Sequence, residues 1–113
     1  MEAKKRNARF YLTEDSQEPA KEWIDSLKDK TVVAKIFTRI RRAENGNFGD
    51  HKSLGDGVGE LRITYGPGYR IYYGIDDCGE LIILLMGGDK SSQEKDILKA
   101  KIFWRDYKNR KDL

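Results

Sequence analysis

The sequence predicts an α+β domain in which a three-stranded antiparallel meander is covered by helices. Residues 59–90 contain three runs of β-type residues, and Gly66-Pro67-Gly68 and Asp76-Asp77-Cys78-Gly79 separate them. Two segments before the meander and one after it show the 3.6-residue spacing of amphipathic helices. With a short strand near the start of the chain, the expected element order is β-α-α-β-β-β-α.

Alternation along the first two runs predicts a sheet with one apolar face. The apolar positions are Leu61, Ile63 and Tyr65 in the first run and Tyr69, Ile71, Tyr73 and Ile75 in the second. The positions between them carry Arg62 and Arg70, together with Glu60, Thr64 and Tyr72. A three-residue loop over Gly66–Gly68 would set Ile63 opposite Ile71 and keep apolar residues facing apolar residues. This register places Arg62 and Arg70 about one diagonal step apart, a pattern that favours an anionic partner.

Two helices are expected before the meander, after a short strand over Arg9–Leu12. The first, within Ser16–Lys28, has apolar residues at i, i+3, i+4 and i+7, namely Ala20, Trp23, Ile24 and Leu27. The second begins near Thr31 and ends at Asn45-Gly46, a left-handed C-cap signal. The short break between them predicts an antiparallel helical hairpin, whose apolar side should cover the apolar face of the meander.

The remaining segments complete the predicted domain. Residues 47–58 are glycine-rich and read as a loop that brings His51 and Lys52 towards the Arg62 side. Leu81–Met86 is apolar throughout, as in a strand buried on both faces, and is expected at the centre of the sheet between the second meander strand and the first strand. Ser91–Glu94 offers a capping box for a last helix. Its predicted buried stripe is Ile97, Ala100, Trp104 and Tyr107, with Leu98 and Ile102 beside it.

Composition narrows the class of protein. The chain has 113 residues with 36% charged side chains, a net charge of +3 and a pI near 8.9, a mildly basic balance that favours a nucleic-acid or acidic-protein partner. A single cysteine, Cys78, excludes a disulfide framework and indicates a reducing compartment. No signal peptide or membrane-length apolar run is visible, so we expect a cytosolic protein without a membrane partner.

Several kinds of chemistry are disfavoured by the residues present. One histidine and one cysteine do not build the common zinc sites, and no cofactor or metal is expected. The Gly55-x-Gly57-x-Gly59 run precedes a strand instead of joining a strand to a helix, which argues against nucleotide-binding loops. A basic cluster on the sheet remains, comprising Arg62, Arg70 and Lys90 with Lys52 and His51 nearby, and with Tyr72 and Tyr73 as aromatic candidates.

Such a cluster suits metal-free cleavage of RNA. Attack of a 2′-hydroxyl on the adjacent phosphorus requires stabilised charge on the phosphate oxygens and a proton for the leaving 5′ oxygen. Arginine binds phosphate through a planar fork, and a tyrosine can stack on an unpaired base. Alternating arginines on a strand are usually just the wet face of a half-buried sheet, and tyrosines in such a sheet are more often core residues or cross-strand pairs than base platforms. The residues alone therefore predict an anion-binding face and no specific reaction.

Two longer strings resemble a known family. GNFGDHKSLGDGVGELRITYGPGYRIYY, followed by LLMGGDKSSQEKDI, resembles the RelE/ParE superfamily of toxins from type II toxin–antitoxin modules, especially the HigB-like branch called addiction module killer proteins. The resemblance implies a RelE-like fold, with a twisted antiparallel sheet against an N-terminal helical hairpin and a C-terminal helix. It also implies an endoribonuclease, since many members are mRNA interferases that cut mRNA in the ribosomal A site without metal and so inhibit translation.

The resemblance also implies roles for individual residues. Arg70 would bind the transition-state phosphate, Arg62 would orient or activate the 2′-hydroxyl, and Lys90 would protonate or stabilise the leaving group. The chain has lysine at position 90 where arginine is common, and Asp96 and Ile97 stand where some members have a tyrosine. The implied partners are mRNA, the ribosome and a helix-turn-helix antitoxin encoded next to the toxin. Two alternatives remain, a ParE-like inhibitor of DNA gyrase and a decayed module that only binds its antitoxin.

Overall fold

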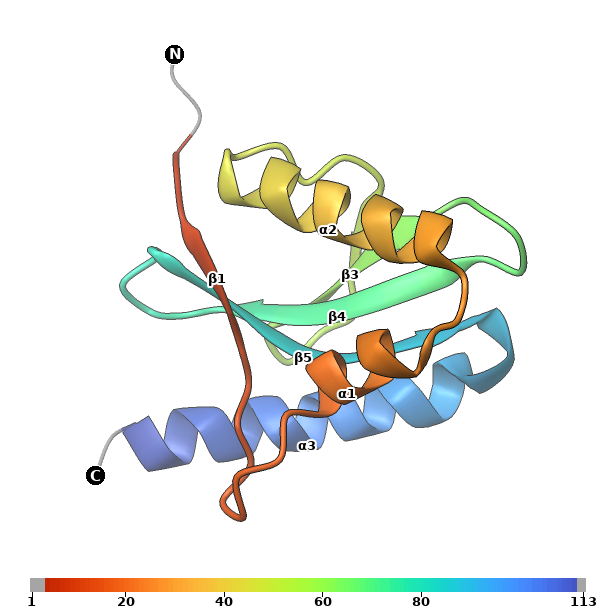
Figure 1. Ribbon diagram of the computed structural model, residues 1–113. Helices are drawn as coiled ribbons and strands as arrows, with labels where there is room; N and C mark the ends of the chain where they lie inside the picture. The colour runs from red at the N-terminus through yellow and green to blue at the C-terminus, as the bar shows by residue number, and fades with distance from the viewer. Residues whose placement is uncertain (1–3, 112–113) are drawn as a thin grey trace.

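The computed structural model describes residues 4–111 and places a five-stranded sheet between two helical layers. Figure 1 shows α1 (Pro19–Ser26) and α2 (Lys30–Glu44) on one face and α3 (Gln93–Lys111) on the other. The strands are β1 (Asn7–Phe10), β2 (His51–Ser53), β3 (Val58–Ile63), β4 (Tyr69–Ile75) and β5 (Leu81–Asp89), and a 3-10 turn, Lys90–Ser92, leads into α3. The predicted α+β class is confirmed.

The strand order is β1-β5-β4-β3-β2, and it differs in part from the expected sheet. β5 lies between β4 and β1 as predicted, but β4 is the middle strand. β1 runs parallel to β5, so the expectation of a wholly antiparallel sheet was wrong. β1 also begins two residues earlier than predicted, where Glu44 of α2 holds its outer edge by accepting a 2.8 Å hydrogen bond from the Ala8 amide.

β2 is a strand that the sequence did not predict. Its three residues are all exposed and pair with β3, His51 opposite Leu61 and Ser53 opposite Gly59. Three polar residues carry no alternation of apolar and polar side chains, so the pattern gave no signal. The turn that follows contains Gly55 and Gly57 at φ of 85° and 82°, values that favour glycine.

The hairpin between β3 and β4 has a different register from the predicted one. Its loop covers Thr64–Gly68, not only Gly66–Gly68, so Ile63 pairs with Tyr69 and Leu61 with Ile71. The shift is two residues, and each side chain therefore stays on its predicted face. The correction places Arg62 directly opposite Arg70, where a diagonal neighbour was expected.

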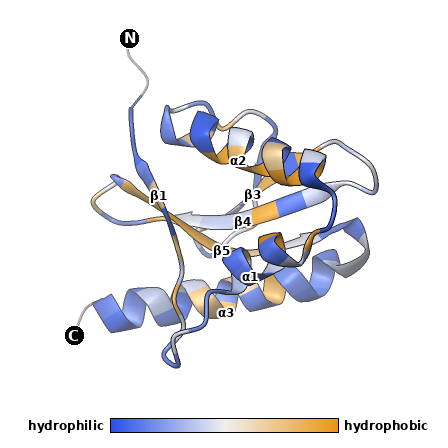
Figure 2. Cartoon of the chain, in the orientation of Figure 1, coloured by the Kyte–Doolittle hydropathy of each residue, from blue (hydrophilic) through white to orange (hydrophobic). Residues whose placement is uncertain are grey.

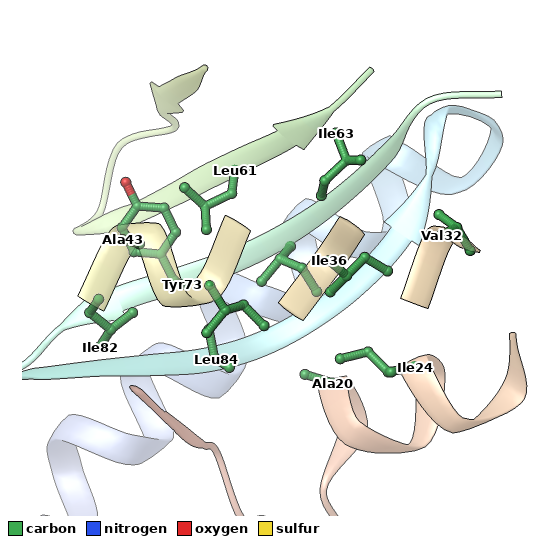
Figure 3. Packing of buried hydrophobic residues seen from close by; sticks show 12 residues of the cluster. Ala20, Ile24, Val32, Ile36, Ala43, Leu61, Ile63, Tyr73, Ile82 and Leu84 are labelled. Carbon is green, nitrogen blue, oxygen red and sulfur yellow. The ribbon is translucent and has the colours of Figure 1, made fainter. Parts of the chain in front are cut away.

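The helical hairpin and the sheet enclose the first of two cores (Figure 3). Its buried members are Ala20, Ile24, Val32, Ile36, Ile40, Ala43, Leu61, Ile63, Ile71, Tyr73, Ile82 and Leu84. Trp23 of α1 lies against the backbone of Gly87 so closely that a Cβ on that residue would clash with the indole ring. The predicted covering of the apolar face by the hairpin is confirmed, although α1 is shorter than Ser16–Lys28.

α3 closes a second core on the opposite face of the sheet. Its buried members are Tyr11, Val58, Tyr72, Ile83, Leu85, Ala100 and Trp104. Ala100 and Trp104 belong to the predicted stripe, but Leu98 and Ile102 are 64% and 62% exposed, so their expected place beside that stripe was wrong. The face that carries the arginines is therefore only partly open to solvent.

The predicted capping box at Ser91–Glu94 does not form. Asp89 accepts a 2.8 Å hydrogen bond from the Ser91 amide and so caps the 3-10 turn. Ser92, the last residue of the 3-10 turn, instead donates its hydroxyl to Asp96 of α3 over 2.5 Å. None of the helices within residues 4–111 has both the length and the apolar character that crossing a membrane requires.

Candidate functional site

A row of charged residues crosses the sheet beside the start of α3. The Arg62 amide donates a 2.9 Å hydrogen bond to the Asp50 carbonyl, Arg62 faces Arg70, and Arg70 faces Gly88. Residues directly opposite one another in a ladder share a face of the sheet, so these positions form one row on the α3 side. Two arginines directly opposite each other repel, and the fold has to compensate for this.

Glu60 supplies the compensating charge from beneath the arginines. Its side chain is 1% exposed, with Oε1 3.3 Å from Arg70 Nε and Oε2 3.6 Å from Arg62 Nε. Gln93, the first residue of α3, donates a 2.9 Å hydrogen bond to Oε1. One buried carboxylate thus serves both guanidinium groups and ties them to the helix. Strand alternation places Glu60 two residues before Arg62 and therefore on the same face, but it does not show that this carboxylate lies between the two arginines.

The arginine contacts to Glu60 are loose. Charge-assisted N–H···O bonds are usually about 2.7–2.9 Å long, and these exceed that range. The Nε atoms of Arg62 and Arg70 are buried without a hydrogen-bond partner among the described residues. The terminal nitrogens of Arg62 make no hydrogen bond to that part of the chain either, and Arg70 Nη1 reaches only the Gly68 carbonyl, at 3.5 Å. The terminal nitrogens of both arginines therefore remain as donors for an anion with several oxygen atoms, whereas the buried Nε atoms face Glu60.

Access to this pair is unequal. The side chain of Arg62 is 39% exposed and that of Arg70 is 13% exposed. Asp50, itself exposed, places Oδ1 3.6 Å from Arg62 Nε at the outer edge of the row. An incoming anion would therefore meet Arg62 first and would reach Arg70 more deeply in the site.

Two predicted lysines lie near the arginine pair. Lys52 pairs with Glu60 across β2 and β3, which places it on the same face of the sheet, and its side chain is exposed. Lys90 is exposed on the 3-10 turn, and its amide donates a 3.1 Å hydrogen bond to the carbonyl of Gly68. Arg70 Nη1 approaches the same carbonyl, so Lys90 lies at the Arg70 end of the row.

His51 does not join this group, which corrects the expectation that it faces the Arg62 side. It pairs with Leu61, a member of the core under the helical hairpin, and therefore belongs to the opposite face. Its Nδ1 lies 2.9 Å from the carbonyl oxygen of Gly49, and its ring centroid lies 5.8 Å from that of Phe48. The one-residue offset from Lys52 decides the face, because side chains alternate along a strand.

Tyr72 and Tyr73 are core residues on opposite faces of the sheet, so neither offers a ring on which a base could stack. Tyr72 is fully buried against α3, its hydroxyl has no hydrogen-bond partner within the described chain, and burial raises its pKa far above the usual range. Tyr73 packs in the first core with its ring 5.4 Å from that of Phe48. The stacking role expected for them is therefore wrong in this conformation.

Arg39 of α2 has a positioning role that the sequence did not reveal. Its Nη2 donates to the carbonyl oxygens of Phe48 and Asp50, at 3.0 and 2.8 Å, and burial lowers its pKa. Gly49, at a φ of 56°, lies against this guanidinium without space for a Cβ. These bonds hold the loop that carries Asp50 beside Arg62. Helical periodicity placed Arg39 on the polar side of α2 but could not show which backbone it would bind.

The site can bind and polarise a multi-oxygen anion with two guanidinium groups, and Lys52 and Lys90 are at neighbouring backbone positions. Within residues 4–111, no three side chains of the His, Cys, Asp and Glu types gather as metal ligands. The exposed Cys78 lies in a turn, as predicted, and its amide bonds to Asp76 away from the arginines.

Comparison with known proteins identifies a relative of this chain but no function. No protein-family model matches the chain. Over 80 residues it is 54% identical to an uncharacterized protein of Haemophilus influenzae, and the match covers 71% of this chain and 80% of that protein. The chain therefore belongs to the same family as the Haemophilus influenzae protein.

Proposed function

We propose that this chain is the toxin of a type II toxin–antitoxin module and cleaves mRNA on the ribosome. The observation that carries the proposal is that Arg62 and Arg70 lie directly opposite each other, with terminal guanidinium nitrogens that can still donate hydrogen bonds. The backbone positions of Lys52 and Lys90 are near this pair. The observed α+β order of strand, helical hairpin, sheet and last helix supports the proposal, because it is compatible with the sequence resemblance, and β2 is an addition. The proposed partners are mRNA, the ribosome and a helix-turn-helix antitoxin, in the cytosol.

In the proposed reaction, the 2′-oxygen forms a bond to phosphorus while the bond from phosphorus to the 5′-oxygen breaks. Arg70, the more enclosed arginine, binds the non-bridging oxygens and stabilises the charge that grows on them. Arg62, at the open edge, orients the 2′-hydroxyl, whose proton passes to solvent. Lys90, at the other end of the row, stabilises the leaving 5′-oxygen as that oxygen takes up a proton. The products are a 2′,3′-cyclic phosphate and a 5′-hydroxyl.

A second candidate is a module that binds its antitoxin without cleaving RNA. Glu60 and Asp50 together match the charge of the two arginines, as in a cluster that only stabilises the fold. A gyrase inhibitor of the ParE type would also need no cleavage site. The three candidates differ in what happens to mRNA when the chain is produced alone.

The test maps mRNA 5′ ends by primer extension after brief induction of the wild-type chain and of Arg70→Ala. We expect new ends at codon-phased positions in the wild type, and in the variant a loss of cleavage of about 100-fold or more, because one charge-stabilising donor is removed. Arg105→Ala is the matched control, since Arg105 is exposed on α3 and forms no ion pair or hydrogen bond with the described residues.

Melting temperatures of both variants check that folding is retained, since Arg70 also neutralises the buried Glu60. Growth arrest with intact mRNA would reject cleavage and favour gyrase or another target. Absence of arrest would favour the antitoxin-binding module. A folded Arg70→Ala variant that still cleaves mRNA would remove the mechanism proposed for the arginine pair.

A further inference from the structure

A cationic groove lies between α2 and the end of β3, next to the arginine pair. It has a volume of about 240 Å³ and is lined by Lys35, Thr38, Arg39, Arg42, Arg62, Ile63 and Thr64. Four of these residues are cationic, two carry hydroxyl groups and none is acidic. Arg62 lines this groove and also belongs to the charged row on the α3 face, so the groove and the row meet at Arg62, at the end of β3.

The helical part of the groove is a single stripe. Lys35, Thr38, Arg39 and Arg42 follow the spacing i, i+3, i+4 and i+7, which places them on one side of α2 along roughly 10 Å. Figure 2 shows hydrophilic residues on the side of α2 that faces away from the sheet. Like charges at i and i+4 destabilise a helix, so this stripe is unfavourable for α2 by itself.

Little within α2 offsets that charge. The helix has five basic residues and one acidic residue, Glu44, whose carboxylate accepts a hydrogen bond from the Ala8 amide. α1 is different, because Lys21 pairs with Asp25 at 2.9 Å within the same helix. A merely solvated helix face usually mixes charges in the manner of α1.

Two of the groove cations are available to a ligand. Arg39 is engaged with the loop before β2, whereas the side chains of Lys35 and Arg42 form no ion pair or hydrogen bond with the described residues and are exposed. Lys35 is held in place by the Tyr65 ring, with Nζ 5.1 Å from the ring centroid. Asp50 reaches the edge of the groove, where it pairs with Arg62.

We propose that this groove binds the phosphodiester backbone of the RNA, which passes from the phosphate held by Arg62 and Arg70 around the end of β3 at Arg62 and then extends along α2. The inference rests on the proposed function and adds a subsite to it. A row of cations and hydroxyl groups matches phosphate oxygens and carries no base-specific contact. An acidic protein segment would be expected to add apolar anchors, but the one aliphatic lining residue, Ile63, is buried in the first core.

The experiment measures binding of an RNA oligonucleotide that cannot be cleaved because every 2′-oxygen is methylated. Fluorescence anisotropy gives the association constant over a range of salt concentrations for the wild type and for Lys35→Gln/Arg42→Gln. For single strands the slope of log K against log salt is about −0.7 per phosphate neutralised, so the double variant should lose about 1.4 from its magnitude. Glutamine is a good helix former and leaves α2 intact.

The control variant, Lys99→Gln/Arg105→Gln, removes two exposed cations from α3 and should keep the wild-type slope. Equal slopes of log K against log salt in the two double variants would overturn the proposal that RNA binds in the groove. The Arg70→Ala test of cleavage would be unaffected by that result. A wild-type protein without measurable affinity for this RNA at low salt would also overturn it. Stronger competition by oligoglutamate than by RNA of equal charge would reject RNA as the occupant.

Discussion

Two buried carboxylates, one at each end of α3, are paired with cations in different ways. Asp76, which is 7% exposed, accepts hydrogen bonds of 2.7 Å from Lys111 and 2.6 Å from the Tyr107 hydroxyl. Glu60, which is 1% exposed, accepts a bond of ordinary length from Gln93, but the Nε atoms of its two arginines remain at 3.3 and 3.6 Å. Asp76 therefore has short hydrogen bonds from both of its partners, whereas the arginines around Glu60 have Nε atoms without a hydrogen-bond partner among the described residues.

This difference separates a structural ion pair from a binding site. Lys111 and Tyr107 hold the pKa of Asp76 well below its usual range, so the folded chain is stabilised by the ionised form. Asp76 thus fastens the last turn of α3 to the end of β4. Buried donors without partners are costly, and the fold retains two of them at Arg62 and Arg70. The terminal nitrogens of the same guanidinium groups are the donors that an incoming anion can use.

The largest effect on stability is expected from Asp76→Asn. The amide keeps the shape of the side chain but loses the charge that strengthens two short hydrogen bonds, and the free energy of unfolding should fall by about 2–3 kcal/mol. Denaturant unfolding at neutral pH measures this change. A loss below about 0.5 kcal/mol would mean that Asp76 does not fasten α3.

The same variant also has a distinctive pH profile. Because the pKa of Asp76 is depressed in the folded state, its contribution is fully present above the ordinary aspartate pKa near 4 and is lost as pH falls below it. The melting temperature of Asp76→Asn should therefore fall less steeply in acid than that of the wild type. Asp89 and Asp106, whose pKa values are lowered by hydrogen bonds from Ser91 and Tyr11, retain part of the acid dependence.

Glu60→Gln should cost less than Asp76→Asn, about 1 kcal/mol by the same denaturant assay. The amide can still accept the hydrogen bond from Gln93, and Asp50 still offsets the charge of Arg62. The contacts that lose their charge attraction are the long ones to Arg62 and Arg70. A cost above that of Asp76→Asn would show that the arginine cluster is as tightly held as the other end of α3. The distinction between a structural ion pair at Asp76 and a binding site at Glu60 would then be wrong.

A matched pair of tyrosine variants includes the smallest expected effect, that of Tyr72→Phe. Tyr107→Phe removes the hydroxyl that binds Asp76 and should destabilise by about 1 kcal/mol, whereas Tyr72→Phe removes a buried hydroxyl without a partner and should be neutral or slightly stabilising. Burial, together with the bond to Asp76, raises the pKa of Tyr107 to about 12. Thermal unfolding measures the change in stability of both variants. Equal destabilisation by Tyr107→Phe and Tyr72→Phe would contradict this prediction.

Much of the candidate site follows from local patterns in the sequence. Alternation along the strands assigned Arg62 and Arg70 to one face, and this survived a register error because the shift was an even number of residues. Helical spacing identified the hairpin and its buried side, and the run Leu81–Met86 identified an inner strand. Lys52 lies in the segment just before the meander and Lys90 directly after its last strand, so chain order brings both towards the arginines.

Features outside the reach of sequence patterns depend on contacts between distant segments. Glu60 meets Gln93 across 33 residues of chain, and Asp76 meets Tyr107 across 31, so only folding decides which carboxylate becomes saturated. The packing of α3 on the second face likewise turned Tyr72 from a candidate stacking platform into a core residue. Residue spacing within one strand or helix determines which face a side chain occupies, and this much the sequence determined by itself. What covers that face, and how completely its polar atoms are paired, was decided only by the tertiary structure, because hydrogen bonding and burial depend on elements that arrive from elsewhere in the chain.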